Sequence, residues 1–325
     1  MKTKQNLLQI CLLAAMLFPA LTSGAQTVTQ IAAGGKSSLL LKSDGSLWAM
    51  GDNQYGELGD GTYNNTNRPE RIVASGVTAI TAGLSHSLFL KSGGSLWGMG
   101  YNDDGELGDG IYNTVSPYGT NRPQQIVASN VTAIAGGAYH SLLLKSDGSL
   151  WAMGYNNDGE LGDGTLNNTN RPEQIVASNV TAIAAGGYHS LFLKNDGSLW
   201  AMGYNYYGQL GDGTYNHTNR PELIVATNVT AIAAGGDHSL FLKNDGSLWV
   251  MGSDQYGQLG DGIYNLTNRP ERIVASNVTA IAGGSGHSLF LKSDGSLWAM
   301  GYNYYGQLGD GTYNTFSPYG TNQPE

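Results

Sequence analysis

Histidine and aspartate, two residue types that can bind metal ions and transfer protons, recur at fixed places in this 325-residue sequence. A histidine precedes a Ser-Leu pair five times, and an aspartate stands between two glycines six times. A catalytic or metal site gathers different residues at one point, whereas these recur along the whole chain. The histidines are His86, His140, His189, His238 and His287, and the aspartates are Asp60, Asp109, Asp163, Asp212, Asp261 and Asp310.

These recurrent residues are therefore predicted to be structural. We expect each histidine to be buried and to tie its strand to a neighbouring loop, and each aspartate to accept backbone N–H groups in a turn. Segments 102–106 and 156–160 resemble calcium loops in part, but neither has the glutamate that such loops carry at their twelfth position. We predict no catalytic residue, no metal ion and no cofactor, and hence no enzyme.

The tryptophans show the period of the repeat to which these residues belong. Four of the five intervals between consecutive tryptophans are 49 residues. The remaining interval is 54 residues, because IYNTVSPYGTNRP in the second copy replaces a loop that is five residues shorter. A period of this size indicates a repeated structural unit, such as a propeller blade or a solenoid turn. The tryptophans are Trp48, Trp97, Trp151, Trp200, Trp249 and Trp298.

Each repeat reads as four short strands. The runs SLFLK and SLWAM flank an Asp-Gly pair, which predicts a β-hairpin with a type I′ turn. The segments VTAIAAGG and IVAS add two further strand candidates, and no helical period of useful length follows residue 26. Four strands repeated radially predict an all-β fold, a β-propeller of six recognisable four-stranded repeats.

The first 25 residues have the features of a secretory signal peptide. Lys2 and Lys4 precede a mostly apolar run over residues 7–21, and small residues stand before Gln26. The alternative is a membrane anchor, but the run is shorter than the roughly 20 apolar residues that span a bilayer. We therefore expect a signal peptide over residues 1–25, a propeller over residues 26–325 without a membrane span, and a secreted or cell-envelope location, as for a bacterial exported protein.

The charge of the chain argues against one class of partner. The formal net charge is −9, and lysine and arginine form no cluster. Nucleic-acid binding usually needs a basic stripe on the protein surface. We expect no nucleic-acid partner.

The copies differ mainly at loop positions, while their strand cores scarcely change. A constant scaffold with variable loops is typical of a recognition surface, although drift at exposed positions is the alternative. Tyrosine dominates the variable positions, and it provides a large contact area at a low entropic cost. The candidate binding residues are Tyr55, Tyr139, Tyr188, Tyr206, Tyr207, Tyr256, Tyr304 and Tyr305.

The repeat resembles that of the regulator of chromosome condensation family. The resemblance rests on GSLWAMGYNYYGQLGDGT and on the HS-L-x-L element, and it extends over residues 27–325. It implies a propeller, normally of seven four-stranded blades. Six copies, with the last one ending before its IVAS segment, indicate a ring that is incomplete at the C-terminus; an open or loosely closed ring is the alternative.

The family resemblance implies several activities of different kinds. They include guanine-nucleotide exchange on a nuclear GTPase, ultraviolet perception in plants, and the secreted β-lactamase inhibitor protein II, which shares the superfamily. We expect a secreted, non-enzymatic propeller that binds a protein or a surface glycan through its tyrosines. Inhibition of a secreted enzyme is one specific form of such protein binding. The alternative is an exchange factor-like regulator of a small GTPase, an activity that in the family depends on a projecting wedge.

Overall fold

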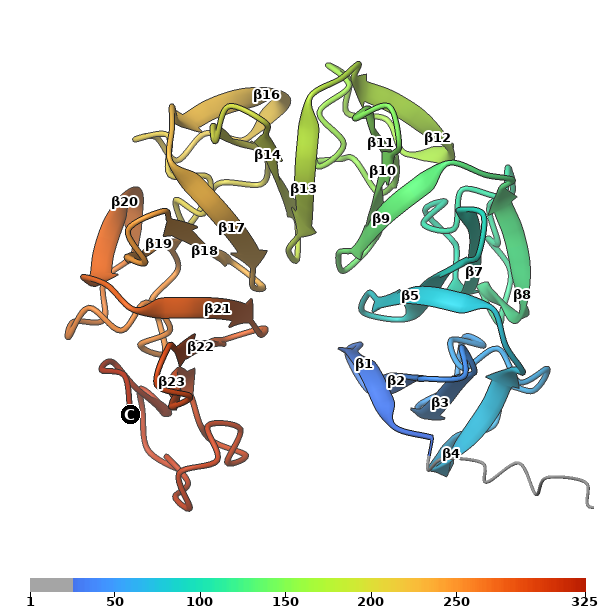
Figure 1. Ribbon diagram of the computed structural model, residues 1–325, viewed down its shortest axis with the longest axis horizontal. Coiled ribbons are helices and arrows are strands. Elements are labelled where there is room, and N and C mark those ends of the chain that lie inside the picture. Colours follow the sequence, from blue (N-terminus) through green and yellow to red (C-terminus); the bar gives the residue numbers. More distant parts are fainter. Residues whose placement is uncertain (1–25) are drawn as a thin grey trace, which may run out of the picture.

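The computed structural model describes residues 26–325, so the predicted signal peptide lies outside the described residues. The described chain contains 24 strands and no helix, and its strands form six antiparallel four-stranded sheets in sequence order. Figure 1 shows these sheets as blades that follow one another around a common axis. The predicted β-propeller of six four-stranded repeats is confirmed.

The first three blades have the following bounds. Blade 1 contains β1 (Val28–Ala33), β2 (Ser37–Lys42), β3 (Leu47–Gly51) and β4 (Thr66–Val73). Blade 2 contains β5 (Val77–Ala82), β6 (His86–Lys91), β7 (Ser95–Tyr101) and β8 (Gly119–Val127). Blade 3 contains β9 (Val131–Gly136), β10 (His140–Lys145), β11 (Leu150–Gly154) and β12 (Thr169–Val176).

The last three blades repeat this pattern. Blade 4 contains β13 (Val180–Ala185), β14 (His189–Lys194), β15 (Leu199–Gly203) and β16 (Thr218–Val225). Blade 5 contains β17 (Val229–Ala234), β18 (His238–Lys243), β19 (Leu248–Gly252) and β20 (Thr267–Val274). Blade 6 contains β21 (Val278–Gly283), β22 (His287–Lys292), β23 (Leu297–Tyr302) and β24 (Gly320–Thr321).

The Asp-Gly hairpins form, but the predicted type I′ turn is wrong. A type I′ turn needs positive φ at both central residues. In the β10–β11 hairpin only Gly148 has positive φ, at 77°, and its N–H donates to the Lys145 carbonyl. Asp147 instead accepts hydrogen bonds from the backbone N–H and the hydroxyl of Ser149, at 2.9 and 2.6 Å. The turn is a longer loop in which only the glycine is left-handed.

The hydrophobic core lies between the blades rather than inside them. In one cluster, Leu142 and Leu150 of blade 3 pack with Val180, Phe192 and Met202 of blade 4, and all five are buried. Equivalent clusters combine the other pairs of consecutive blades. A single blade therefore cannot bury its own apolar face, and neighbouring repeats stabilise one another.

The ring opens between its first and last blades. The inner strands of consecutive blades contact each other from β1 to β21, and Figure 1 shows blades 1 and 6 on either side of an opening. Leu297 of blade 6 is 65% exposed, whereas Leu248, at the same repeat position in blade 5, is completely buried. Across the described residues the ring is open between blades 1 and 6, as both an incomplete ring and an open ring would be.

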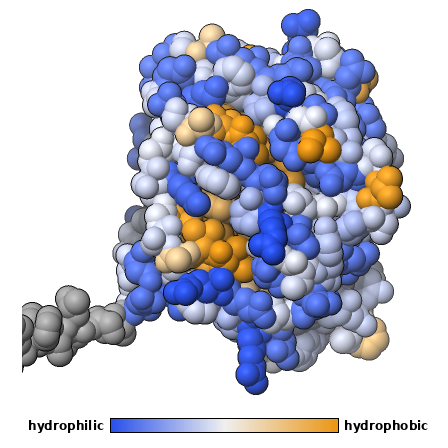
Figure 2. All heavy atoms as spheres, turned by 90° about the vertical axis from the view of Figure 1, so that its right-hand side faces the viewer, coloured by the Kyte–Doolittle hydropathy of each residue, from blue (hydrophilic) through white to orange (hydrophobic). Residues whose placement is uncertain are grey.

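The outer side of the blades is mostly polar. Figure 2 shows the face on the right of Figure 1 as largely hydrophilic, with small separate hydrophobic areas. The outermost strands carry exposed carboxylates such as Glu70 on β4 and Glu173 on β12. No helix in the described part of the chain is long and apolar enough to cross a membrane.

Candidate binding face

Two variable positions of each repeat are joined by backbone hydrogen bonds at one end of the blade. One precedes the second strand and the other follows the third. In blade 3 the N–H of Tyr155 donates to the carbonyl of Tyr139, and in blade 4 the N–H of Tyr204 donates to the carbonyl of Tyr188, both at 2.8 Å. Gly154 makes this possible, because it has φ of 107° and an added Cβ would lie 2.6 Å from the Tyr139 oxygen. Paired residues therefore project from the same end of each blade.

The tyrosine rings at this end form a continuous chain of contacts across blades 1 to 4. The ring of Tyr101 lies 5.0 Å from that of Tyr55 and 6.2 Å from that of Tyr139, measured between centroids. Tyr139 and Tyr188 are 5.7 Å apart, and Tyr188 lies 6.1 Å from Tyr204. Most pairs are tilted or edge-to-face, the arrangements that aromatic rings prefer. The first arc consists of Tyr55, Tyr101, Tyr139, Tyr155, Tyr188, Tyr204, Tyr206 and Tyr207.

A second arc covers blades 5 and 6. Tyr302 lies 4.7 Å from Tyr256, and Tyr304 lies 4.9 Å from Tyr305. The two arcs are interrupted within blade 5, where Asp237 and Ser253 occupy positions that are tyrosines in blades 3 and 4. The second arc consists of Tyr256, Tyr302, Tyr304, Tyr305 and Tyr319. We call the two arcs together the tyrosine face.

The structure places all eight sequence-predicted tyrosines on the tyrosine face. Tyr206, Tyr304 and Tyr305 are exposed, by 62%, 39% and 75% of their surface. The other five, which include Tyr139 and Tyr188, are half-buried against neighbouring rings. The exposed rings are free to lose surface to a ligand, and the half-buried rings support them.

The recurrent aspartates hold the loops that carry the variable tips. In blade 3, Asp163 accepts hydrogen bonds from the N–H of Thr165 at 2.8 Å and from Nδ2 of Asn156 at 3.1 Å. The Oδ1 of Asn156 accepts the N–H of Leu161 at 3.0 Å, so the two ends of the loop are tied together. Asp60, Asp109, Asp212, Asp261 and Asp310 likewise accept the N–H two residues further on.

The recurrent histidines join adjacent blades. Nε2 of His140 lies 3.0 Å from Oγ of Ser190 in the next blade, and that hydroxyl donates to the Glu160 carbonyl at 2.7 Å. Since the hydroxyl proton is used, the histidine must donate from Nε2. The partner is a strand serine rather than the loop expected from the sequence. His86, His189 and His238 make the same contact, whereas His287 of blade 6 lines a cavity together with glycines and alanines of the inner strands.

Burial keeps these histidines neutral. It lowers the pKa of His86 to about 4, and that of His140, His189 and His238 to about 3, because a charged imidazole loses its hydration inside the ring. They are spread one to a blade, and within residues 26–325 no group of three or more histidine, cysteine, aspartate or glutamate side chains could hold a metal ion.

Carboxylates accompany the tyrosines in blades 1 to 3. Glu106 and Glu160 are completely buried, and burial raises the pKa of each to about 8. Burial, assisted by Asp103, Glu106 and Asp104, raises the pKa of Tyr101 above its ordinary value. With a pKa of about 8 the two glutamates are mostly protonated at neutral pH, so the negative charge at this part of the tyrosine face comes mainly from aspartates such as Asp103 and Asp104.

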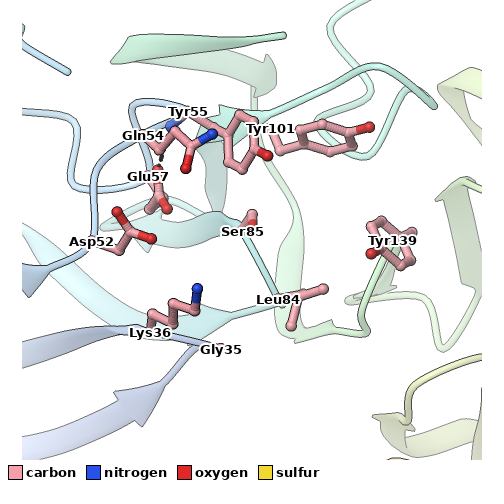
Figure 3. A pocket seen from close by; sticks show the side chains of 10 residues that line it. All are labelled: Gly35, Lys36, Asp52, Gln54, Tyr55, Glu57, Leu84, Ser85, Tyr101 and Tyr139. Carbon is pink, nitrogen blue, oxygen red and sulfur yellow. Dashed lines mark hydrogen bonds between the residues drawn. The ribbon is translucent and has the colours of Figure 1, made fainter. Parts of the chain in front are cut away.

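A cavity of about 280 Å³ opens on the tyrosine face between blades 1 and 2. Figure 3 shows Asp52, Glu57 and Lys36 on one side of it and Tyr139 on the opposite side. Its lining thus combines aromatic rings with both signs of charge. A second, axial cavity of about 490 Å³ is lined mainly by glycine and alanine from the inner strands.

Comparison with known families gives three matches. The RCC1-like domain matches residues 118–324, and two forms of the regulator of chromosome condensation (RCC1) repeat match residues 44–90 and residues 28–57 and 77–106. The chain belongs to the RCC1 repeat family. The family resemblance read from the sequence is thus confirmed.

Three solved structures are similar to this chain. Human WBSCR16 is 26% identical with a TM-score of 0.82, over 93% of this chain and 81% of that one. Prp20p from Saccharomyces cerevisiae is 24% identical with a TM-score of 0.76, over 91% of this chain and 75% of its own. Yeast RCC1 (Prp20) bound to Kap60 is 24% identical with a TM-score of 0.73, over 85% and 70%.

The RCC1 repeat explains the constant residues, whereas the tyrosine face comes from positions that vary between the copies. Sequence reasoning missed the tyrosine that follows Met-Gly, which bridges the predicted rings. A signal was present, because this position varies from blade to blade: it holds Asp52 in blade 1 and Ser253 in blade 5. The missed residues are Tyr101, Tyr155, Tyr204 and Tyr302.

Proposed function

We propose that this RCC1-repeat propeller is a non-enzymatic protein-binding module whose partner docks on the tyrosine face. The observation that carries the proposal is the continuous contact of tyrosine rings across four blades. Tyrosine is enriched in protein interfaces and in their energetically dominant residues. Rings that already pack on one another lose little side-chain freedom on binding, so more of the contact energy is available for affinity.

The rigidity of the underlying blades supports the same proposal. The loops that carry the tyrosines are held by the asparagine–aspartate hydrogen bonds, and the blades are held together by shared cores and by the histidine–serine contacts. A preorganised surface binds with a smaller ordering cost than a mobile one. A surface glycan, which could also stack on aromatic rings, is the competing ligand.

We expect the double variant Tyr139→Ala and Tyr188→Ala to weaken partner binding by about 30-fold or more, as for other central interface aromatics. Partners are captured by crosslinking to the wild-type protein, and the affinity of each purified partner is then measured by surface plasmon resonance. Tyr215→Ala is the matched control, since Tyr215 is 46% exposed and lies outside both arcs. Unchanged affinity in the double variant, or capture of glycans alone, would contradict the proposal.

A second candidate function is regulation of a small GTPase. The comparisons favour it over inhibition of a secreted enzyme, because the Prp20p structure is described together with binding to Gsp1p and histones. Export directed by residues 1–25 to the medium or cell envelope would favour the inhibitor form, because an exported chain does not meet a cytosolic GTPase. A mature N-terminus at Gln26 is the sign of such export.

Nucleotide release tests this second candidate directly. If the chain is an exchange factor-like regulator, the wild-type propeller will speed the release of fluorescent GDP from Gsp1p at least tenfold, and the Tyr139→Ala, Tyr188→Ala variant will not. The Tyr215→Ala variant should act like the wild type. Release that is no faster with the propeller than without it excludes exchange on this GTPase and leaves the binding proposal standing.

A further inference from the structure

The loop tips of blades 2 and 3 are acidic, whereas those of blades 4 and 6 are Tyr-Tyr pairs. Blade 2 carries Asp103 and Asp104, and blade 3 carries Asp158 at the equivalent place. All three are half-buried beside the first arc of tyrosines. Nδ2 of Asn168, from blade 3, donates to Asp104 at 2.8 Å, so the two acidic loops touch.

These carboxylates lack neutralising cations. Across residues 26–325 the only ion pair is His217 with Asp158, at 2.9 Å, and it is an ion pair only when the imidazole is protonated. Lys36 lies in the cavity between blades 1 and 2, on the Asp52 side, and pairs with neither Asp103 nor Asp104. The uncompensated negative charge is therefore concentrated at blades 2 and 3.

Two buried glutamates lie beneath the same acidic loops. Glu106 and Glu160 are completely buried, and each has one carboxyl oxygen with no hydrogen-bond partner among the described residues. The other oxygens accept the N–H groups of Asp104 and Asp158, at 3.1 and 3.0 Å, so both carboxyls lie directly under the acidic loops. Blades 4 to 6 carry the neutral glutamine at this position. Burial raises the pKa of both glutamates, and a cation bound above would favour their ionised form.

Tyrosine rings complete the environment that a cation prefers. Tyr139 lies 6.2 Å from both Tyr101 and Tyr155, beside the acidic loops. The negative face of an aromatic ring attracts lysine and arginine side chains, and a carboxylate close to the ring adds a Coulomb attraction. The same surface repels phosphates and acidic peptides.

We propose that this part of the tyrosine face binds a lysine- or arginine-bearing segment of the protein partner, with the cationic side chains held between the tyrosines and the carboxylates of Asp103, Asp104 and Asp158. This inference rests on the proposed function and names the chemistry of its partner. The negative charge of these carboxylates is complementary to the positive charge of a basic protein segment.

The test uses a 12-residue peptide with four spaced lysines and the same peptide with acetylated lysines. Isothermal titration calorimetry at low salt measures both against the full chain. We expect the lysine peptide to bind at least tenfold more tightly than the acetylated one. The triple variant Asp103→Asn, Asp104→Asn, Asp158→Asn should lose at least tenfold in affinity for the lysine peptide.

A matched control removes the same charge elsewhere. The triple variant Glu70→Gln, Glu173→Gln, Glu271→Gln changes exposed residues of the outer strands β4, β12 and β20, and should bind the lysine peptide as the wild type does. An equal loss in both triple variants shows only a general effect of net charge and overturns the inference. So does the absence of measurable binding to the wild type at millimolar peptide.

The tyrosine variant separates this inference from the proposed function. If Tyr139→Ala, Tyr188→Ala weakens binding of the purified partner but the aspartate variant does not, the binding face stands and the cationic segment is wrong. If neither variant weakens binding of the partner, both proposals fail. Thermal unfolding of each variant, expected to match the wild type within a few degrees, shows that the aspartate variant is folded.

Discussion

Replacing Asp254 by asparagine should stabilise the propeller, raising the free energy of unfolding at pH 8 by about 3 kcal/mol. In blade 4 the equivalent Asn205 donates from Nδ2 to Asp212 at 3.1 Å and accepts the N–H of Leu210 at 3.0 Å. Asp254 accepts the N–H of Leu259 at 2.7 Å, but its second oxygen has no partner among the described residues. An asparagine would restore the missing donor.

The effect should depend on pH with a definite sign. Burial, with Asp261 and Glu271 adding repulsion, raises the pKa of Asp254 to about 8. An aspartate in the unfolded chain titrates near pH 4, so between about pH 4 and 8 only the folded state keeps the proton. The folded protein with Asp254 therefore loses stability as the pH rises through this range. Asparagine does not titrate, so the advantage of the variant should be small near pH 4 and largest at pH 8.

Urea unfolding at pH 4.5, 6 and 8 measures this difference between wild type and variant. The reverse change, Asn205→Asp, is the matched control and should destabilise the chain most at pH 8. For a chain of this size, a gain of 3 kcal/mol corresponds to a rise in Tm of roughly 5–10 °C. A gain that is the same at all three pH values would show that ionisation of Asp254 is not its cause.

Replacing Phe192 by alanine should destabilise the propeller by about 3–5 kcal/mol, because it leaves a cavity in a packed core. Phe192 is completely buried, packs with Leu142 and Leu150 of the preceding blade, and stacks on Trp200 at 6.1 Å. Since the core is shared between two blades, the cavity lies at their interface and weakens the attachment of blade 4 to blade 3.

The chain itself supplies the control for this prediction. Leu143 occupies the position of Phe192 in blade 3 and is also completely buried. Phe192→Leu should therefore cost much less than Phe192→Ala, about 1 kcal/mol. Thermal unfolding followed by circular dichroism compares the two variants. Equal losses, or a loss below about 1 kcal/mol for alanine, would contradict a core that lies between the blades.

The sequence alone determined the blade. The 49-residue spacing of the tryptophans, the short apolar runs and the Asp-Gly pairs are local signals, and strand formation and chain reversal depend mostly on residues close in sequence. The type of turn was not decided locally, because a glycine at a hairpin serves several loop geometries. In the β10–β11 hairpin Leu144 pairs with Leu150, and this register of the two strands sets the longer loop in which Gly148 has positive φ.

Only the tertiary structure decided which residues meet across blades. His140 and Ser190 are 50 residues apart, and Tyr101 and Tyr139 belong to different repeats, so their contacts depend on how each blade is rotated against the next. The repeat period does not specify that rotation. The negative potential of blades 2 and 3 has the same origin, because carboxylates from separate loops act together only where the packed blades bring those loops side by side.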